Sequence, residues 1–181
     1  MARNVEIKAR VRDFESIQQV AESLTDRPVE ELRQIDTFFY PPRGRFKLRE
    51  FADGRGELIA YARSDNNGPT LSDYYILRTD RADGMKSFLG ELLGIRGIVK
   101  KRRLLYHIGP TRIHLDQVEG LGDFLELEVV LDDGEAESEG ARTADEVMKK
   151  LGMVDAERIA CAYIDLLERE DGAENQGSRE S

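Results

Sequence analysis

At 181 residues, with 40% hydrophobic and 35% charged side chains, the chain is predicted to form one globular domain with a sizeable core and a very polar surface. The formal net charge of −9 excludes a general nucleic-acid or acidic-membrane binder, while leaving room for a local basic site. No apolar run approaches the length of a membrane span, and we find no signal-peptide pattern. The single Cys161 excludes an internal disulfide and a Cys-based metal cluster, so we expect a reducing, cytoplasmic location.

The first predicted strand, residues 4–12, divides its side chains into two unlike faces. Apolar and polar residues alternate along it with period two, which is typical of a strand that is buried on one side. Its polar face consists of Asn4, Glu6, Lys8, Arg10 and Arg12. Solvation explains one such face, but the same division recurs in several later strands, which favours a shared role for the polar faces.

The remaining elements follow in chain order. Seven further segments are predicted as strands from their alternation or their β-branched and aromatic content: 34–40, 45–51, 57–63, 72–79, 97–108, 111–118 and 123–131. Four segments with helical spacing of apolar residues are predicted as helices: 13–24, 80–93, 143–151 and 155–168. The polar segment 64–70 is predicted as a loop, either a mobile lid or disordered. The domain is expected to span 1–168, followed by a disordered tail at 169–181.

The charged strand faces indicate an unusual architecture. In an ordinary sandwich such faces point to water, but four helices are available here to cover the apolar faces from outside. We therefore predict an α+β fold, a closed, eight-stranded, mainly antiparallel β-barrel with a charged interior and helices packed outside. The basic residues on the polar faces are Lys8, Arg10, Lys47, Arg49, Arg63, Arg78, Lys101, Arg103 and Arg112. The acidic residues are Glu6, Asp116, Glu126 and Glu128.

A barrel interior of this composition requires a ligand. Crowded like charges repel one another, so the bases need a strongly anionic guest. A polyphosphate is suitable because Arg and Lys each donate several charge-assisted hydrogen bonds to phosphate oxygens. The carboxylates would repel such a guest unless a divalent cation lay between them. The sequence therefore predicts a small-molecule polyphosphate ligand together with a metal ion.

The number and order of these motifs resemble the CYTH superfamily over roughly residues 4–168. The motifs are Glu6-x-Lys8, Asp36-Thr37-Phe38, Lys47-x-Arg49, Lys101-x-Arg103, and the run from Arg112 through Asp116 to Glu126-x-Glu128. This superfamily contains class IV adenylyl cyclases, thiamine triphosphatases and inorganic triphosphatases, all built on a triphosphate tunnel. Its usual opening is Glu-x-Glu-x-Lys, whereas Asn4 stands here at the first Glu and offers an oxygen without a charge.

The resemblance implies a role for each matching residue. It implies Mg²⁺ or Mn²⁺ as the cofactor, with the ligands Glu6, Asp116, Glu126 and Glu128. It implies triphosphate contacts from Lys8, Lys47, Arg49, Arg63, Lys101, Arg103 and Arg112, to which the strand faces add Arg10 and Arg78. Catalytic roles are assigned to Lys8, Asp116 and Glu126. His114 lies on the polar face but has no second His at ligand spacing, so it is not assigned to the metal.

Three functions are consistent with such a site. The first is a class IV adenylyl cyclase that converts ATP to cyclic AMP and pyrophosphate, towards which the similarity leans. The second is a triphosphatase that hydrolyses inorganic tripolyphosphate or thiamine triphosphate. The third is a polyphosphate- or nucleotide-binding module without turnover, which Asn4 makes more plausible. In each case the expected partner is a small-molecule triphosphate, with no nucleic acid and no membrane, and the protein is expected to be a monomer or homodimer.

Overall fold

The computed structural model describes residues 2–63 and 70–177, with side chains for residues 3–61 and 74–170. Within these residues the strands are β1 Ala2–Arg10, β2 Glu30–Phe39, β3 Arg45–Phe51, β4 Gly56–Arg63, β5 Thr70–Thr79, β6 Ile95–Ile108, β7 Thr111–Val118 and β8 Gly122–Val130. The helices are α1 Phe14–Leu24, α2 Ala82–Leu93, α3 Glu137–Lys150 and α4 Tyr163–Gly177. The prediction of an α+β fold with eight antiparallel strands and four helices is confirmed.

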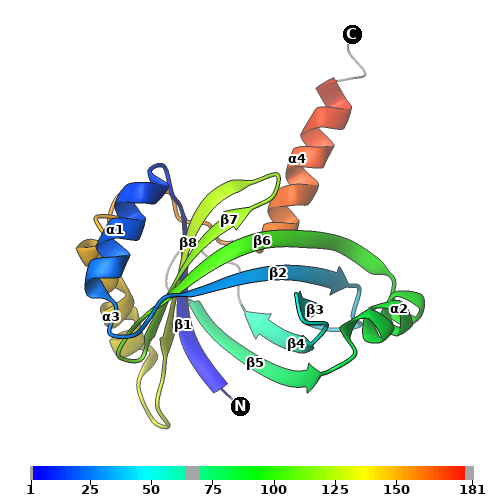
Figure 1. Cartoon of the computed structure of the whole chain (residues 1–181), viewed down its shortest axis with the longest axis horizontal. Helices are drawn as coiled ribbons and strands as arrows, with labels where there is room; N and C mark the ends of the chain where they lie inside the picture. The colour runs from blue at the N-terminus through cyan, green and yellow to red at the C-terminus, as the bar shows by residue number, and fades with distance from the viewer. Residues whose placement is uncertain (1, 64–69, 178–181) are drawn as a thin grey trace.

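The sheet curls so that its strands follow the order β1-β5-β4-β3-β2-β6-β7-β8 (Figure 1). Every pairing between neighbours is antiparallel. One edge of β1 pairs with β8 over residues 4–10, whereas the other pairs with β5 over residues 2–6. Beyond that point this second edge is covered by residues 157–159, whose backbone hydrogen-bonds to Lys8 and Arg10. The inner faces of the strands therefore surround a common interior.

Three of the helices cover the outer face of the sheet where the strands are apolar. Helices α1 and α3 pack against β1, β6, β7 and β8, and Ile7 and Leu127 of the sheet share one core with Met148 of α3. Helix α2 places Leu89 against Phe39 and Leu48 of β2 and β3. Because side chains alternate between the faces of a strand, burying the apolar set outside turns the charged set inward.

Helix α4 begins later than predicted, at Tyr163 rather than near residue 155. The preceding residues 157–159 are extended because they pair with β1 instead of forming helical hydrogen bonds. The first turn is stabilised by Asp165, whose carboxylate accepts a hydrogen bond from the backbone N–H of Ala162. This end of α4 packs with inner-face residues such as Phe124 and fills one end of the interior. The helix continues to Gly177, past the predicted domain end, and the boundary at residue 168 stays a prediction.

Two other elements start at least four residues earlier than the sequence predicted. Strand β2 starts at Glu30 rather than residue 34, because its first residues pair with β6. Helix α3 starts at Glu137 rather than residue 143, and Gly140 in its first turn permits close packing against Val5 and Leu131. The predicted loop at 64–70 lies outside the described residues except for Thr70 in β5. None of the helices in the described part of the chain is long and apolar enough to cross a membrane.

Candidate functional site

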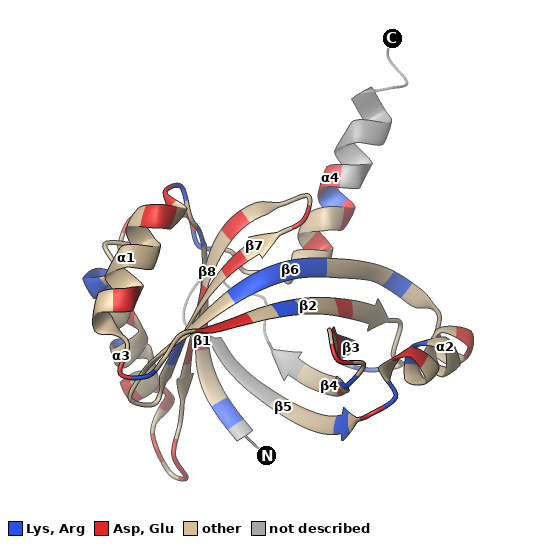
Figure 2. Ribbon diagram, viewed as in Figure 1, with Lys and Arg blue, Asp and Glu red and all other residues tan. Residues whose placement is uncertain are grey.

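The inner faces of the strands line a cavity of about 540 Å³. Most of the predicted site residues line it: Glu6, Lys8, Lys47, Arg49, Arg78, Lys101, Arg103, Arg112, Glu126 and Glu128. They come from strands that are far apart in the sequence, so the curled sheet is what brings them together. Figure 2 shows basic residues gathered along β6 and acidic residues on β7 and β8. Parts of β2 and β3 also carry charged residues.

The first group of interior charges is centred on Asp36, which is 2% exposed. Lys47 Nζ donates to its Oδ2 at 2.8 Å, and Arg49 donates through Nε and Nη2 at 2.9 and 3.0 Å. Lys101 Nζ lies 3.9 Å from the same carboxylate. Burial raises the pKa of Asp36, but the charges of Arg49, Lys47 and Lys101 outweigh it and hold the pKa well below its usual range. Asp36 is therefore an ionised counter-ion that fixes three bases in place.

A second buried aspartate, Asp116, is fully enclosed. Arg103 donates to both of its oxygens at 2.6 Å, and the Tyr163 hydroxyl donates to Oδ2 at 2.9 Å. Lys101 Nζ is 3.6 Å from Oδ2. Burial raises the pKa of Asp116, but the charges of Arg103 and Lys101 outweigh burial. The net pKa is below its usual range, so the carboxylate is ionised. These contacts are those of a counter-ion with both oxygens engaged, and the metal-ligand and catalytic roles assigned to Asp116 stay predictions.

Two lysines lie between these groups and the remaining acids. Burial, together with the charge of Arg103, lowers the pKa of Lys101 from 10.5 to about 7. Lys8 Nζ is 3.7 Å from Glu126 Oε1 and lies 4.2 Å from the centroid of the Tyr163 ring. A bound polyanion would favour the charged form of Lys101, so the cavity is electrostatically prepared for anionic ligands.

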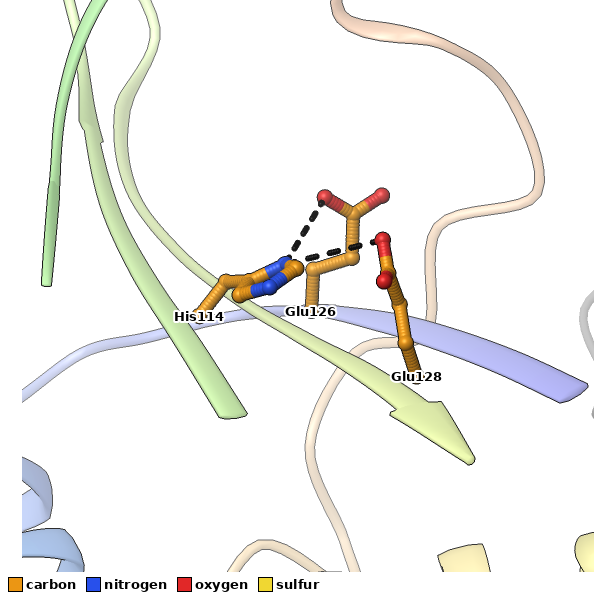
Figure 3. A group of neighbouring side chains, drawn as sticks. All are labelled: His114, Glu126 and Glu128. Atoms are coloured by element: carbon orange, nitrogen blue, oxygen red, sulfur yellow. Dashed lines mark ion pairs between the residues drawn. The ribbon is translucent and has the colours of Figure 1, made fainter. Parts of the chain in front are cut away.

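The third group consists of His114, Glu126 and Glu128, whose possible ligand atoms all lie within 4.8 Å of one another (Figure 3). His114 Nδ1 is 3.9 Å from Glu126 Oε2 and 3.7 Å from Glu128 Oε1. Arg103 donates to Glu126 Oε2 at 2.7 Å, and Arg112 Nη2 lies 3.0 Å from Glu128 Oε2. Hard carboxylate oxygens suit Mg²⁺ and Mn²⁺, so the donor set fits the predicted cofactor.

Further polar groups face the same region. Glu6 lies opposite Glu128 in the ladder between β1 and β8 and lines the cavity. Asn4, two residues earlier on the same face, is 2% exposed, and its Oδ1 has no hydrogen-bond partner among the described residues. The Oε1 atom of Gln34, another cavity residue, is in the same state. Buried acceptors usually have partners, so these two oxygens are candidates for contacts with a ligand or water.

Three predicted phosphate contacts are not placed in the centre of the cavity. Arg10 lies beyond it, where its Nη1 donates to the carbonyl of Leu121 at 3.2 Å. Arg78 lies at the rim with a side chain that is 87% exposed, 3.6 Å from Glu57. Arg63 belongs to β4, but its side chain is outside the described part of the chain. Their roles as phosphate contacts stay predictions.

No site role is predicted from the sequence for Asp36, Tyr163 or His114. Asp36 was visible as part of a motif, but its function as counter-ion depends on bases from β3 and β6. Tyr163 lies inside the segment 155–168 that is predicted as a helix, whereas in the structure it is the first residue of α4 and its hydroxyl donates to Asp116. His114 shares its strand face with Arg112, and its proximity to two glutamates on β8 required the ladder register.

Comparisons with known proteins agree with this geometry. A family model described as CYTH domain matches residues 2–163. Adenylate cyclase CyaB of Aeromonas hydrophila is 25% identical over 174 residues, covering 91% of this chain and 88% of the relative. The structure of a Pyrococcus horikoshii protein shows 28% identity, 90% and 98% coverage and a TM-score of 0.74. A Hippeastrum protein reported with a dominant triphosphatase activity shows 14% identity, 92% and 96% coverage and a TM-score of 0.66. The chain therefore belongs to the CYTH domain family.

Proposed function

We propose that the protein is a metal-dependent enzyme acting on a triphosphate held inside the curled sheet, and that it is a class IV adenylyl cyclase. The observation that carries this proposal is one cavity in which Lys and Arg side chains of β1, β3, β6 and β7 meet a carboxylate group on β8. Similarity to the Aeromonas cyclase over 91% of the chain supports the cyclase reaction. Pairing of β1 with both β5 and β8 supports a closed barrel around the substrate.

The bases of the cavity are held in place by carboxylates of the protein itself. Asp36 holds Lys47 and Arg49, and Asp116 holds Arg103. Side chains fixed in this way lose little rotamer freedom on binding, so more of the charge-assisted hydrogen-bond energy contributes to affinity. A triphosphate would then be neutralised by residues from several strands at once: Lys8, Lys47, Arg49, Lys101, Arg103 and Arg112.

The carboxylates of Glu126 and Glu128 are proposed to hold Mg²⁺ or Mn²⁺, with Glu6 facing the same region from β1. When bound, such an ion neutralises phosphate charge and stabilises an attacking or leaving oxygen. The protein residues orient the phosphate chain and exclude water. Both functions follow from the position of the side chains inside the sheet.

In the proposed reaction the ribose 3′-hydroxyl of ATP gives up its proton, which the leaving pyrophosphate takes up, and its oxygen attacks the α-phosphorus. The bond from the α-phosphorus to the bridging oxygen breaks, and pyrophosphate leaves. Negative charge grows on the leaving pyrophosphate, and the bases around it stabilise that charge more strongly than they stabilise the substrate. Enclosure within the sheet favours the internal hydroxyl over water as the nucleophile.

A triphosphatase is the second candidate. The Hippeastrum protein, which shares the fold over 92% of this chain, is reported with a dominant triphosphatase activity. The same bases would serve this reaction, because phosphoryl transfer depends on positioning and charge neutralisation rather than on one nucleophilic side chain. The substrates to compare are inorganic tripolyphosphate and thiamine triphosphate.

The test is incubation of the full chain with ATP, tripolyphosphate or thiamine triphosphate, each with Mg²⁺ or Mn²⁺, and identification of the products. Cyclic AMP with pyrophosphate in equal amounts is the expected result. Orthophosphate from tripolyphosphate without cyclic AMP from ATP would replace the cyclase by a triphosphatase. Tight triphosphate binding without turnover of any substrate would indicate a binding module.

A further inference from the structure

In the third group, the histidine nitrogen is close enough to each glutamate to share one ion with it. Two atoms that both bind a metal at about 2.1 Å lie no more than about 4.2 Å apart. His114 Nδ1 satisfies this limit with Glu126 Oε2 at 3.9 Å and with Glu128 Oε1 at 3.7 Å. Neither distance is a hydrogen bond, since such bonds between nitrogen and oxygen span about 2.7–3.2 Å. An ion bound by all three side chains would explain why the histidine nitrogen lies near both carboxylates without a hydrogen bond to either.

A second observation is the environment of one imidazole nitrogen. His114 is 4% exposed, and its Nδ1 atom is buried without a hydrogen-bond partner among the described residues. A buried polar atom in this state is destabilising unless something occupies its lone pair or accepts its proton. Figure 3 shows the ring directed towards both glutamates. The lack of a hydrogen-bond partner for Nδ1 among the described residues is thus a second sign of a ligand, besides the two neighbouring glutamates.

The other histidine gives an internal comparison. His107 also has a buried Nδ1 without a partner among the described residues. However, it belongs to no cluster of possible metal ligands in the part of the chain that the structure describes. The two histidines therefore differ in the carboxylates beside them.

The neighbouring cations limit the site. Arg103 donates to Glu126 Oε2, the same oxygen that lies nearest His114, and Arg112 pairs with the second oxygen of Glu128. These contacts leave the donor set with two glutamates whose charges are partly offset. Because these glutamates attract a cation less strongly, a metal ion that also forms a partly covalent bond to nitrogen should bind better than one held by charge alone. Imidazole nitrogen suits first-row transition metals, whereas Mg²⁺ prefers oxygen and water.

We infer that His114 is a metal ligand together with Glu126 and Glu128, and that this site takes a first-row transition-metal dication such as Mn²⁺ in preference to Mg²⁺. The inference deepens the proposed function, on which it rests for the role of the ion in turnover. Binding of the ion itself is independent of which triphosphate the enzyme uses.

The test uses Mn²⁺ alone as the probe, with the full chain and no nucleotide. Electron paramagnetic resonance measures free Mn²⁺ during titration, and electron spin-echo modulation detects a nitrogen bonded to the ion. The His107→Gln protein keeps His114 as its single histidine, because the chain has 2. We expect nitrogen modulation in the parent and in His107→Gln, and its loss in His114→Gln with an affinity decrease of about tenfold or more. Mg²⁺ should displace the bound Mn²⁺ only when the Mg²⁺ concentration is in large excess.

Three results would overturn the inference. They are the absence of nitrogen modulation in His107→Gln, its persistence in His114→Gln, and displacement of Mn²⁺ by an equal concentration of Mg²⁺. The first of these needs no change at His114, so a folding defect of His114→Gln does not affect it. Calorimetry with tripolyphosphate in EDTA separates this inference from the proposed function. Unimpaired binding with no nitrogen signal would reject only the histidine ligand, whereas a nitrogen signal without triphosphate binding would reject only the proposed function.

Discussion

The interior of the sheet contains two kinds of carboxylate. Asp36 and Asp116 are almost fully buried, and each accepts short charge-assisted hydrogen bonds from two or more side chains. Glu126 and Glu128 have side chains that are 14% and 18% exposed, and they lie beside a histidine nitrogen that has no hydrogen-bond partner among the described residues. The aspartates are therefore arranged as permanent counter-ions, and the glutamates as a site whose partners can be exchanged.

This difference explains how the protein itself compensates a densely charged interior. The aspartates offset the mutual repulsion of the bases and hold them in position. The glutamates contribute less to that balance, so they can bind a cation without dismantling the ion pairs on which the fold depends. Substitutions should separate the two kinds of carboxylate by their effects on unfolding and on ligand binding.

The largest effect is expected for Asp116→Asn. Breaking a buried ion pair leaves Arg103 and Lys101 undercompensated, and we expect a loss of about 3 kcal/mol in the free energy of unfolding. This is the lower part of the usual range because Arg103 keeps its contact with Glu126. Urea unfolding measures it, with the exposed Asp133→Asn as control. Equal stability of both variants would remove the distinction between counter-ion and exchangeable carboxylate.

Arg49→Ala tests whether bases held by an aspartate are also the phosphate contacts. Loss of one charge-assisted contact should weaken triphosphate binding by about 1–3 kcal/mol. Arg102→Ala removes a base that pairs with Glu31 outside the cavity, and its affinity should equal that of the parent. Isothermal titration with tripolyphosphate compares the two variants. Similar losses in both would show that binding follows net charge rather than the cavity.

Glu128→Gln addresses the exchangeable pair. We expect the Mn²⁺ affinity to fall by at least about tenfold, as is common even when a partner of a metal ligand is removed. The free energy of unfolding should change little, in contrast to Asp116→Asn, because Glu128 is partly exposed and accepts mainly from Arg112. Parallel metal titration and urea unfolding of the variant provide the comparison. A stability loss as large as that of Asp116→Asn, with metal affinity intact, would contradict it.

Lys101 connects the two aspartates and gives the interior a pH dependence. Its folded-state pKa of about 7 is below the ordinary 10.5, so the unfolded chain binds more protons between these pH values. The destabilisation is therefore complete below pH 7 and is relieved as the pH rises. We expect the parent to gain about 2 kcal/mol relative to Lys101→Met between pH 7 and 9. Lys100→Met, on the exposed face of the same strand, should follow the parent; a flat difference for Lys101→Met would contradict the shift.

The smallest effect is expected at the position where the chain departs from the family opening. Asn4 is buried on the cavity face with its Oδ1 unsatisfied among the described residues. Asn4→Glu adds a negative charge near Glu6, and we expect Mn²⁺ to bind about threefold tighter through this Coulomb term. Asn4→Gln has a similar volume without the charge and serves as control. Equal gains in both variants would assign the effect to shape rather than charge.

Much of the site was predictable from local pattern, but its division into two kinds of carboxylate was not. The alternation in residues 4–12 and its recurrence predicted strands with one charged face, and the helices predicted a cover for the apolar face. Glu126 and Asp116 were grouped together because both are acidic residues on neighbouring polar faces. The structure separates them, since Arg103 and Tyr163 occupy both oxygens of Asp116. Which carboxylate is saturated depends on partners far away in the sequence.

By itself the sequence determined the charge of each strand face, because side chains alternate strictly along an extended backbone and burying one face commits the other. It also determined the family, through motifs spread over most of the chain. The tertiary structure decided which charges meet. Because residues 157–159 pair with β1, helix α4 begins only after them. Tyr163 then lies where its hydroxyl donates to Asp116. The register of β7 against β8 places His114 beside Glu126. Such contacts depend on ladder register and chain crossing, which local periodicity does not encode, because many registers satisfy the same alternation.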